Sequence, residues 1–267
     1  MKKVGSCSES ILMHYGTSML PLTQLLSFEI GQDCNLMIQH KHKCPASLIK
    51  RTERILTDDI IINSSIEAYS LGFEGLISWS FYNEPMIHAR RILNLMEIIR
   101  SKIPQSRFLL WTNGTILIED QRMGLFEQIF VTNYLSTPAD TLAKYFGNIV
   151  LFKDNPQLDD RLSCHADPSD EWRKKRCGMP FDNFIISNTG EVYMCCMDWN
   201  NDIKIGSIFD STIKELNEIR NVYIRKISGK VMLEDAPKTC INCAFKWNTH
   251  FVDHDIRRKA ISQIGSL

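Results

Sequence analysis

The chain has 267 residues, of which 44% are hydrophobic and 23% are charged, as is ordinary for a packed globular protein. At roughly 150 residues per domain, this length suits one large domain or a domain with a small appendage. Basic and acidic residues number 31 each, and this zero net charge argues against a broad electrostatic surface for nucleic acid or membrane. No apolar run reaches the roughly 18 residues of a membrane span, and residues 1–10 lack the apolar stretch of a secretory signal. We therefore expect a soluble, cytoplasmic protein with no nucleic-acid or membrane partner.

The first half of the chain alternates segments with the patterns of strands and helices. Strands are expected at residues 26–30, 75–82, 107–111, 128–132 and 148–152, and helices at 57–71, at 87–103 and before the fourth strand. Thr57 is a candidate N-cap followed by two acids, and Pro104 follows the second helix. Repeated strand–helix units predict an α/β fold with a mostly parallel sheet and helices outside it.

Three polar segments follow strands of this expected sheet. They are the loop 32–45, which holds two cysteines and two histidines, and the turns 83–85 and 112–114. The carboxyl ends of parallel strands share one edge, and sheets of this kind bind ligands there. We therefore expect the three segments to meet at one rim.

The pattern changes after about residue 153. Residues 154–176 are polar, contain two prolines and are expected to form a linker. Residues 183–194 have the pattern of a hairpin that turns at 188–190. A short helix at 211–219, a polar connection at 226–238 and a weak closing helix at 256–267 are expected to follow.

Nine cysteines are the most informative feature of the composition. An odd number without a secretory signal fits a disulfide framework poorly, and clustered cysteines in a cytosolic chain indicate metal binding or redox chemistry. Cys7 and Cys164 have no close cysteine neighbour and are expected to be small buried hydrophobic residues. The other cysteines form two clusters: Cys34 and Cys44, and Cys177, Cys195, Cys196, Cys240 and Cys243.

The later cluster has the composition of a metal site. Cys240 and Cys243 form a C-x2-C pair, a spacing that lets two thiolates bind one centre. With Cys177 and one of the adjacent Cys195 and Cys196 they supply four thiolates, which suit either zinc or an iron–sulfur cluster. The other thiol of the adjacent pair is expected to be a bystander or a core residue.

The earlier cluster has two interpretations. Nine residues separate Cys34 from Cys44, and His40 and His42 are among them. The loop could be a solvated basic segment that happens to carry cysteines. Alternatively, two cysteines and one histidine could hold three corners of a metal centre and leave the fourth open, as a catalytic site requires.

Several segments together resemble the radical SAM superfamily and its auxiliary-cluster module, called SPASM or, when short, twitch. Those of the first half are Phe28-Glu29-Ile30, Cys34-Asn35-Leu36, Cys44-Pro45, Ser80-Phe81-Tyr82-Asn83-Glu84-Pro85 and Leu110-Trp111-Thr112-Asn113-Gly114. Those of the second half are Cys177, Gly190-Glu191-Val192-Tyr193-Met194-Cys195, Ile205-Gly206-Ser207-Ile208 and Cys240-x2-Cys243. Their order and spacing carry the resemblance, which covers about residues 25–250. Family members that dehydrogenate aminocyclitols are similarly short and have four auxiliary cysteines at broadly similar intervals.

The resemblance implies a partial (β/α) barrel that holds a [4Fe–4S] cluster and S-adenosylmethionine. Reductive cleavage of that cofactor would give a 5′-deoxyadenosyl radical that abstracts hydrogen from a substrate. Glu84 would contact the methionyl amino group, because a carboxylate accepts hydrogen bonds from an ammonium. The further cofactor-binding residues that the resemblance implies are Tyr82, Asn83, Pro85 and Asn113.

The second half then resembles a module that holds an auxiliary [4Fe–4S] cluster, an acceptor for the substrate electron. In the family pattern the cysteine after G-x-V-x-x is the ligand, which selects Cys195 alongside Cys177, Cys240 and Cys243. Arg161 resembles an N-R-x-G segment that lines the active site of related enzymes; a solvated loop arginine is the alternative.

The first cluster loop departs from the family pattern C-x3-C-x2-C, because the middle cysteine is absent. Lys41 cannot ligate iron while it is charged. A histidine is the natural replacement, since imidazole also ligates iron, and it should raise the cluster potential. Five residues separate Cys34 from His40 and seven separate it from His42, against three in the family, so His40 is favoured. Cys7 is the remaining candidate if neither histidine is the ligand.

The resemblance divides the chain into five parts. They are an N-terminal extension (1–24), a radical SAM-like partial barrel (25–153), a linker (154–176), a SPASM/twitch-like module (177–250) and a C-terminal helix (251–267).

The function that follows is a radical SAM oxidoreductase acting on a small sugar-, aminocyclitol- or natural-product-like substrate. An external reductant such as flavodoxin or ferredoxin would supply the electron. Two alternatives stay open: a peptide-modifying maturase, which commonly carries a longer module with more cysteines, and a degenerate, non-catalytic binding protein that kept the fold.

Overall fold

The computed structural model describes residues 23–49, 55–147, 150–154, 161, 162, 169, 171, 177, 179–228 and 234–244. Cys7, Cys164, most of the linker expected at 154–176 and the closing helix expected at 256–267 lie outside these described residues. Within the described part, no helix is both long and apolar enough to cross a membrane.

The elements follow the alternating order that the sequence predicts. The strands are β1 (Leu25–Phe28), β2 (Leu76–Ser78), β3 (Arg107–Thr112), β4 (Phe126–Asn133), β5 (Val150–Asp154), β6 (Asn183–Ile186), β7 (Glu191–Tyr193) and β8 (Gly206–Ser207). The α-helices are α2 (Met37–His40), α3 (Asp58–Ser70), α4 (Ala89–Lys102), α5 (Ala139–Phe146), α7 (Met179–Asp182), α8 (Ile213–Ser228) and α9 (Lys238–Asn242). Three 3₁₀ turns are η2 (Pro45–Ser47), η3 (Pro85–His88) and η4 (Gln121–Leu125).

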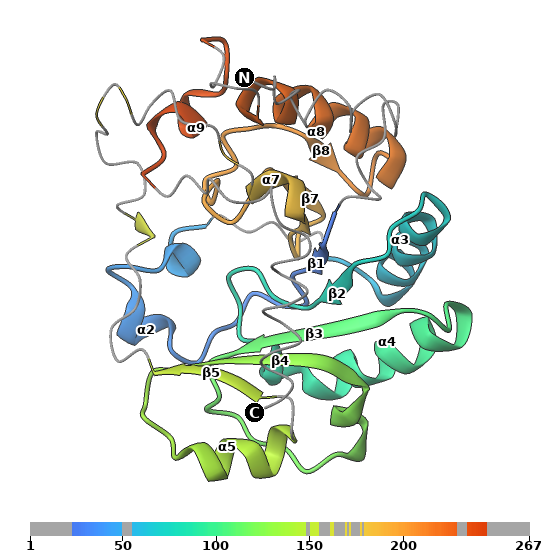
Figure 1. Ribbon diagram of the computed structural model, residues 1–267, viewed down its shortest axis with the longest axis vertical. Helices are drawn as coiled ribbons and strands as arrows, with labels where there is room; N and C mark the ends of the chain where they lie inside the picture. The colour runs from blue at the N-terminus through green and yellow to red at the C-terminus, as the bar shows by residue number, and fades with distance from the viewer. Residues whose placement is uncertain are drawn as a thin grey trace, which may run out of the picture.

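The strands of the described part form one sheet in the order β5-β4-β3-β2-β1-β6-β7-β8. Strands β1 to β5 pair in parallel, and β6 also pairs in parallel with β1, from Leu25 opposite Asn183 to Phe28 opposite Ile186. Only the pairs β6–β7 and β7–β8 are antiparallel. In Figure 1 the strands β3, β4 and β5 lie toward one end of the molecule, with α5 beside them, and α8 and α9 lie toward the other end. The expected partial barrel with a small hairpin unit is confirmed, and the hairpin continues the barrel sheet.

Strand β1 lies between β2 and β6 in the sheet, and it is buried along its whole length. Leu25, Leu26 and Phe28 are buried, as near-continuous apolar runs are in strands covered on both faces. Ser27 is the polar exception, and its hydroxyl is 3.1 Å from the hydroxyl of Ser78 in β2. This pairing places the loops after β1, β2 and β6 next to one another.

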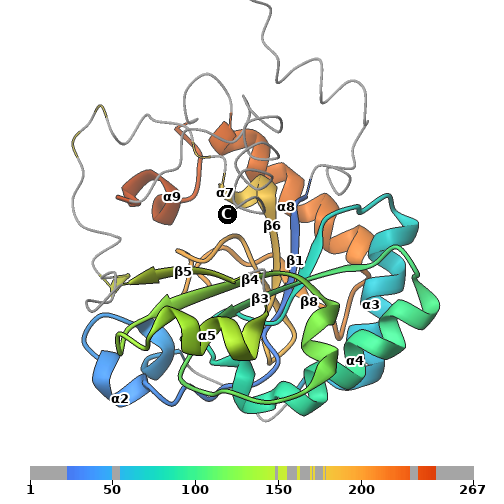
Figure 2. The ribbon, with the colours of Figure 1, turned by 60° about the horizontal axis from the view of Figure 1, so that its bottom comes forward.

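Helices α3 and α4 pack against each other, and both lie away from α2 in the two views (Figures 1 and 2). The helical spacing predicted for α4 is confirmed, because Ile92, Leu95, Met96 and Ile99 are all buried. The predicted N-cap of α3 is confirmed as well, since the Thr57 side chain accepts a hydrogen bond from the backbone N–H of Ile60.

Helix α8 lies beside α3 and is longer than the expected 211–219 (Figure 2). The Glu67 carboxylate of α3 accepts hydrogen bonds from the backbone N–H groups of Ile213 and Lys214, both at 3.1 Å. A carboxylate at this end satisfies unpaired amides and complements the helix dipole. The helix continues to Ser228 because Ile224 and Ile227 are fully buried.

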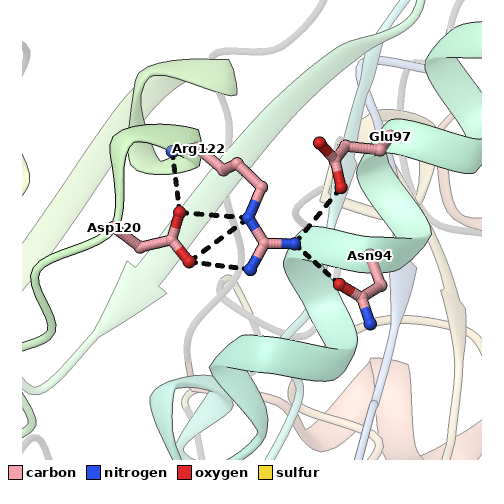
Figure 3. A network of polar contacts seen from close by, with 4 residues as sticks. All are labelled: Asn94, Glu97, Asp120 and Arg122. Carbon is pink, nitrogen blue, oxygen red and sulfur yellow. Dashed lines mark hydrogen bonds and ion pairs between the residues drawn. The ribbon is translucent and has the colours of Figure 1, made fainter.

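The helix expected before the fourth strand does not form; between β3 and β4 the structure has only the short 3₁₀ turn η4. The Asp120 side chain accepts from the backbone N–H of Arg122, a local bond that competes with helix formation. The Arg122 guanidinium then bonds to the Asp120 carboxylate, to Glu97 and to Asn94, the last two on α4 (Figure 3). This network fastens η4 to α4.

Candidate active site

The turns after β2 and β3 are joined by the buried carboxylate of Glu84. It accepts hydrogen bonds from the Thr112 hydroxyl at 2.6 Å, from the Asn113 N–H at 2.8 Å and from the Met86 N–H at 3.0 Å. Burial raises the pKa of Glu84, and the three hydrogen bonds only partly offset that effect. Glu84 therefore holds the third-strand turn in place.

The loop after β1 is fastened to the same turn. The backbone N–H of Glu84 donates to the Asp33 carbonyl at 2.8 Å. The Asn113 amide donates to the Asn35 side chain at 2.8 Å, and Asn35 donates to the Thr115 hydroxyl at 2.6 Å. The three segments that the sequence places at one rim are thus hydrogen-bonded to one another.

A cavity of about 410 Å³ opens at this rim. That volume is typical of small-molecule sites, which run from about 300 to 1,000 Å³. Predicted site residues that line it are Cys34, His40, Cys44, Tyr82, Asn83, Asn113 and Arg161. The predicted Glu84, Pro85 and His42 are not part of its wall. Sequence reasoning did not single out Tyr134 and Cys196 for the site, although both line the cavity.

His40 and Cys44 lie one helical turn apart. The Cys44 N–H donates to the His40 carbonyl at 2.8 Å, a pattern that puts residues four apart on the same side of the chain. Burial, together with nearby Lys43, lowers the pKa of His40, which favours the neutral imidazole that can bind a metal. Burial raises the pKa of the Cys34 thiol. His42 is exposed.

Arg161 reaches the cavity from the segment before the second unit. Its backbone N–H donates to the Lys43 carbonyl at 3.0 Å, which anchors it beside the cluster loop. Its guanidinium carbon lies 5.6 Å from the centre of the Tyr82 ring, within cation–π distance. Burial acts to lower the pKa of Arg161, but the electrostatic effect of Tyr82, Cys196 and Cys44 raises it above its usual value.

Cys177, Cys195, Cys240 and Cys243 converge on a second, smaller hollow. Each is 8 or 9% exposed, so four thiols are buried together. Burial raises the pKa of Cys195 well above its usual value, and the neighbouring cysteines add to that effect. This donor set fits an iron–sulfur cluster, because coordination deprotonates buried thiols that would otherwise stay protonated.

Within the described part, no three His, Cys, Asp or Glu side chains lie close enough to bind a single metal ion. A four-iron cluster does not need such close spacing, because each thiolate binds a different iron.

Hydrogen bonds also link the segment that carries Cys195 to the segment that carries Cys240 and Cys243. The Asp198 N–H donates to the Cys195 carbonyl at 3.2 Å, and the Asp198 carboxylate accepts from the Asp202 N–H at 2.9 Å. The Asp202 carboxylate in turn accepts from the Thr239 hydroxyl at 2.8 Å, next to Cys240. The hairpin and the C-x2-C pair are therefore tied directly to each other.

The adjacent cysteines face two different sites. Cys195 lines the four-thiol hollow, whereas Cys196, expected to be a bystander or a core residue, lines the larger cavity. The Tyr82 hydroxyl donates to the Cys196 carbonyl and joins the two sites. Residues 194–197 form a bend and a turn after β7, so no strand pattern in the sequence marked Cys196.

Glu29 is a further residue that sequence reasoning did not assign to the site. Its carboxylate is fully buried and accepts from the Tyr82 N–H at 3.2 Å and from the Asn188 N–H at 2.9 Å. It therefore joins the loop after β2 to the turn of the hairpin. A charged residue inside a buried strand pattern was the signal that marks it.

Comparisons with known proteins agree with this geometry. Residues 177–244 match the SPASM family, an iron-sulfur cluster-binding domain. The chain is 25% identical over 211 residues to the S-adenosyl-L-methionine-dependent 2-deoxy-scyllo-inosamine dehydrogenase of Niallia circulans, and the match covers 73% of this chain and 82% of the relative. Residues 177–244 are therefore a SPASM-type region, and the chain is similar over most of its length to an S-adenosyl-L-methionine-dependent dehydrogenase.

Two solved structures have a fold similar to that of this chain. A crystal structure of BtrN in complex with AdoMet and 2-DOIA has a TM-score of 0.60 and 20% identity, and the match covers 83% of the enzyme and 93% of BtrN. A crystal structure of BtrN in an open conformation has a TM-score of 0.62 and 20% identity, with coverage of 83% and 92%.

Proposed function

We propose that this enzyme reductively cleaves S-adenosylmethionine at the larger cavity and oxidises a small sugar-, aminocyclitol- or natural-product-like substrate. A [4Fe–4S] cluster and S-adenosylmethionine bound there would supply the radical that abstracts hydrogen. The protein would position the cofactor against the substrate and exclude water. The observation that carries the proposal is the convergence of Cys34, His40 and Cys44 on a cavity that borders a four-thiol site.

Cys34, Cys44 and His40 are the proposed protein ligands at this cavity. His40 is preferred to His42 because it lines the cavity with both cysteines and lies one turn from Cys44, whereas His42 is exposed. Burial favours the neutral form of His40, which is the form that can bind iron.

Tyr82, Asn83 and Asn113 are the proposed contacts of S-adenosylmethionine, because they line the same cavity. Glu84 and Pro85 are retained as proposed neighbours of the cofactor. The Glu84 carboxylate already accepts three hydrogen bonds, so it would act mainly by holding Thr112 and Asn113 in position. Arg161 is the proposed substrate-facing residue.

Cys177, Cys195, Cys240 and Cys243 are the proposed ligands of an auxiliary [4Fe–4S] cluster that accepts the substrate electron. The proposed division places the first site in residues 25–153 and the auxiliary cluster in residues 177–250. The bond from Tyr82 to the Cys196 carbonyl supports electronic contact between the two, because it leads from the cavity to the residue next to Cys195.

A small substrate is favoured over a peptide by two observations. The cavity volume of about 410 Å³ is that of a small-molecule site, and a dehydrogenase of a small aminocyclitol is a relative along most of the chain. An external flavodoxin or ferredoxin is the proposed reductant.

The test is formation of 5′-deoxyadenosine from S-adenosylmethionine by anaerobically reconstituted enzyme under a strong reductant. Wild type should form it, and Cys34→Ala and Cys44→Ala should lose it. His40→Ala should lose it while the matched variant His42→Ala retains it, because only His40 lies on the cavity wall.

Loss in His42→Ala with retention in His40→Ala would reverse the ligand assignment. A wild type that neither forms 5′-deoxyadenosine nor binds S-adenosylmethionine would overturn the proposal and favour a non-catalytic binding protein.

A further inference from the structure

The charge in the larger cavity is carried by one residue. Among the described residues of its wall, Arg161 is the one side chain with a permanent charge, and no aspartate or glutamate is present there. The other polar side chains of that described wall are hydroxyls, thiols, amides and the imidazole of His40.

Arg161 has no carboxylate partner within the part of the chain that the structure describes. Its guanidinium lies over the Tyr82 ring, and the groups that act on it electrostatically are phenols and thiols. The buried carboxylates nearest the rim are already hydrogen-bonded: Glu84 to the third-strand turn, and Glu29 to the loop after β2 and the hairpin.

The guanidinium of Arg161 is stabilised in this cavity when an anion binds to it. Removing a charge from water is costly unless the charge is paired, and a cation–π contact offsets only part of that cost. Guanidinium binds carboxylate and phosphate through two parallel hydrogen bonds. The backbone bond to Lys43 and the Tyr82 ring hold Arg161 in place before a ligand arrives.

We propose that Arg161 binds an anionic group of the substrate, a carboxylate or a phosphate, and that the enzyme selects acidic substrates over amines. This inference rests on the proposed function and names the substrate class of the same cavity. An ammonium group placed beside Arg161, with no carboxylate on the described wall, would be repelled. This inference narrows the proposed substrate range to its acidic members and removes aminocyclitols from it.

The methionyl carboxylate of S-adenosylmethionine is the other source of an anion in this cavity. Arg161 lies over Tyr82 and close to Cys196, on the wall that borders the four-thiol site. Asn83 and Asn113 lie on the side of the second- and third-strand turns. Because Tyr82 is also a proposed contact of the cofactor, the affinity of Arg161→Gln for S-adenosylmethionine decides between the two anions.

The experiment measures binding rather than turnover. Full-length reconstituted enzyme with S-adenosylmethionine and no reductant is titrated with D-glucuronate, D-glucose and D-glucosamine, which share one ring and differ in charge. Wild type should bind glucuronate about tenfold or more tightly than glucosamine, as one charged hydrogen-bonded pair allows. Arg161→Gln should abolish that preference, and Arg161→Lys should restore part of it.

Arg107→Gln is the matched control, because Arg107 lies at the opposite end of β3, is paired with Glu127 and is 46% exposed. It should keep the wild-type preference. Affinity for S-adenosylmethionine, measured separately, should be unchanged in Arg161→Gln, and its thermal unfolding should show a folded protein.

Three outcomes would overturn the inference. One is glucosamine binding to wild type as tightly as glucuronate. Another is loss of S-adenosylmethionine affinity in Arg161→Gln with the sugar preference intact, which would assign the guanidinium to the cofactor. The last is no binding of either glucuronate or inorganic phosphate up to about 10 mM. Absence of 5′-deoxyadenosine formation would instead contradict the proposed function.

Discussion

Glu84 is a buried carboxylate whose two oxygens accept three hydrogen bonds, from Thr112, Asn113 and Met86. Resemblance alone assigns it to the amino group of the cofactor. The structure adds a positioning role, because the carboxylate holds the turn that carries Asn113 to the cavity wall. Both oxygens of a carboxylate accept hydrogen bonds, whereas an amide accepts them only through its single oxygen.

Glu84→Gln should therefore destabilise the enzyme by about 1–3 kcal/mol, because its amide N–H₂ would face a buried donor. The measurement is the thermal unfolding temperature of the reconstituted protein. Glu119→Gln is the control, since Glu119 is 75% exposed and lies 3.9 Å from Lys144. An equal loss in both variants would contradict the positioning role.

The difference in stability between wild type and Glu84→Gln should depend on pH. A carboxyl whose pKa is raised on folding binds its proton more tightly in the folded chain. Its contribution to stability is full below the unfolded pKa and is lost as the pH rises through the folded pKa. The advantage of wild type over Glu84→Gln should thus widen as the pH falls from about 7 toward the ordinary glutamate value of 4.5. A difference in stability between the two proteins that stays constant over this pH range would show that the pKa of Glu84 is not raised on folding.

The β6–β7 hairpin depends on its turn glycine. Gly190 has a φ of +81°, which side-chain-bearing residues rarely adopt, and a Cβ there would overlap the ring of Phe209. Its N–H donates to the Ser187 carbonyl, and its carbonyl accepts from Ile208. The hairpin carries Cys195 two residues after the end of β7, so this turn also positions the four-thiol site.

Gly190→Ala should lower stability by about 1–3 kcal/mol through backbone strain alone, with more from the clash with Phe209. In a chain of this size each kcal/mol corresponds to roughly 2–4 °C in Tm. Gly124→Ala is the matched control, because nothing lies within 4 Å of its added Cβ. Iron retention at the second site should fall in Gly190→Ala and not in Gly124→Ala; equal Tm values would contradict the account.

Elements with a strong local signal could be predicted from the sequence, and those set by distant contacts could not. Thr57, the acids after it and the apolar spacing of α4 are local, and both helices begin and end close to the expected residues. The segment before β4 was misjudged because the Asp120 side chain bonds to its own backbone neighbour instead of allowing a helix. The length of α8 was underestimated because burial of Ile224 and Ile227 extends it.

At the scale of the whole molecule, the two sites share one sheet and one wall. The parallel pairing of β6 with β1 brings the hairpin against the loops of the barrel. Tyr82 reaches across to the Cys196 carbonyl, and Glu29 bonds to both Tyr82 and Asn188. Residues so far apart in the sequence have no shared local pattern, so composition and spacing indicated two cysteine clusters without indicating that they are neighbours.

The central claim is that one chain carries two clusters, one at the cavity of Cys34, His40 and Cys44 and one at the four-thiol site. Iron per chain after anaerobic reconstitution tests it most directly. Two four-iron clusters predict about eight irons in wild type, about four in Cys195→Ala, and the full number in the adjacent Cys196→Ala. A wild-type value near four that falls to zero in Cys195→Ala would show that only the auxiliary cluster exists and would contradict the account.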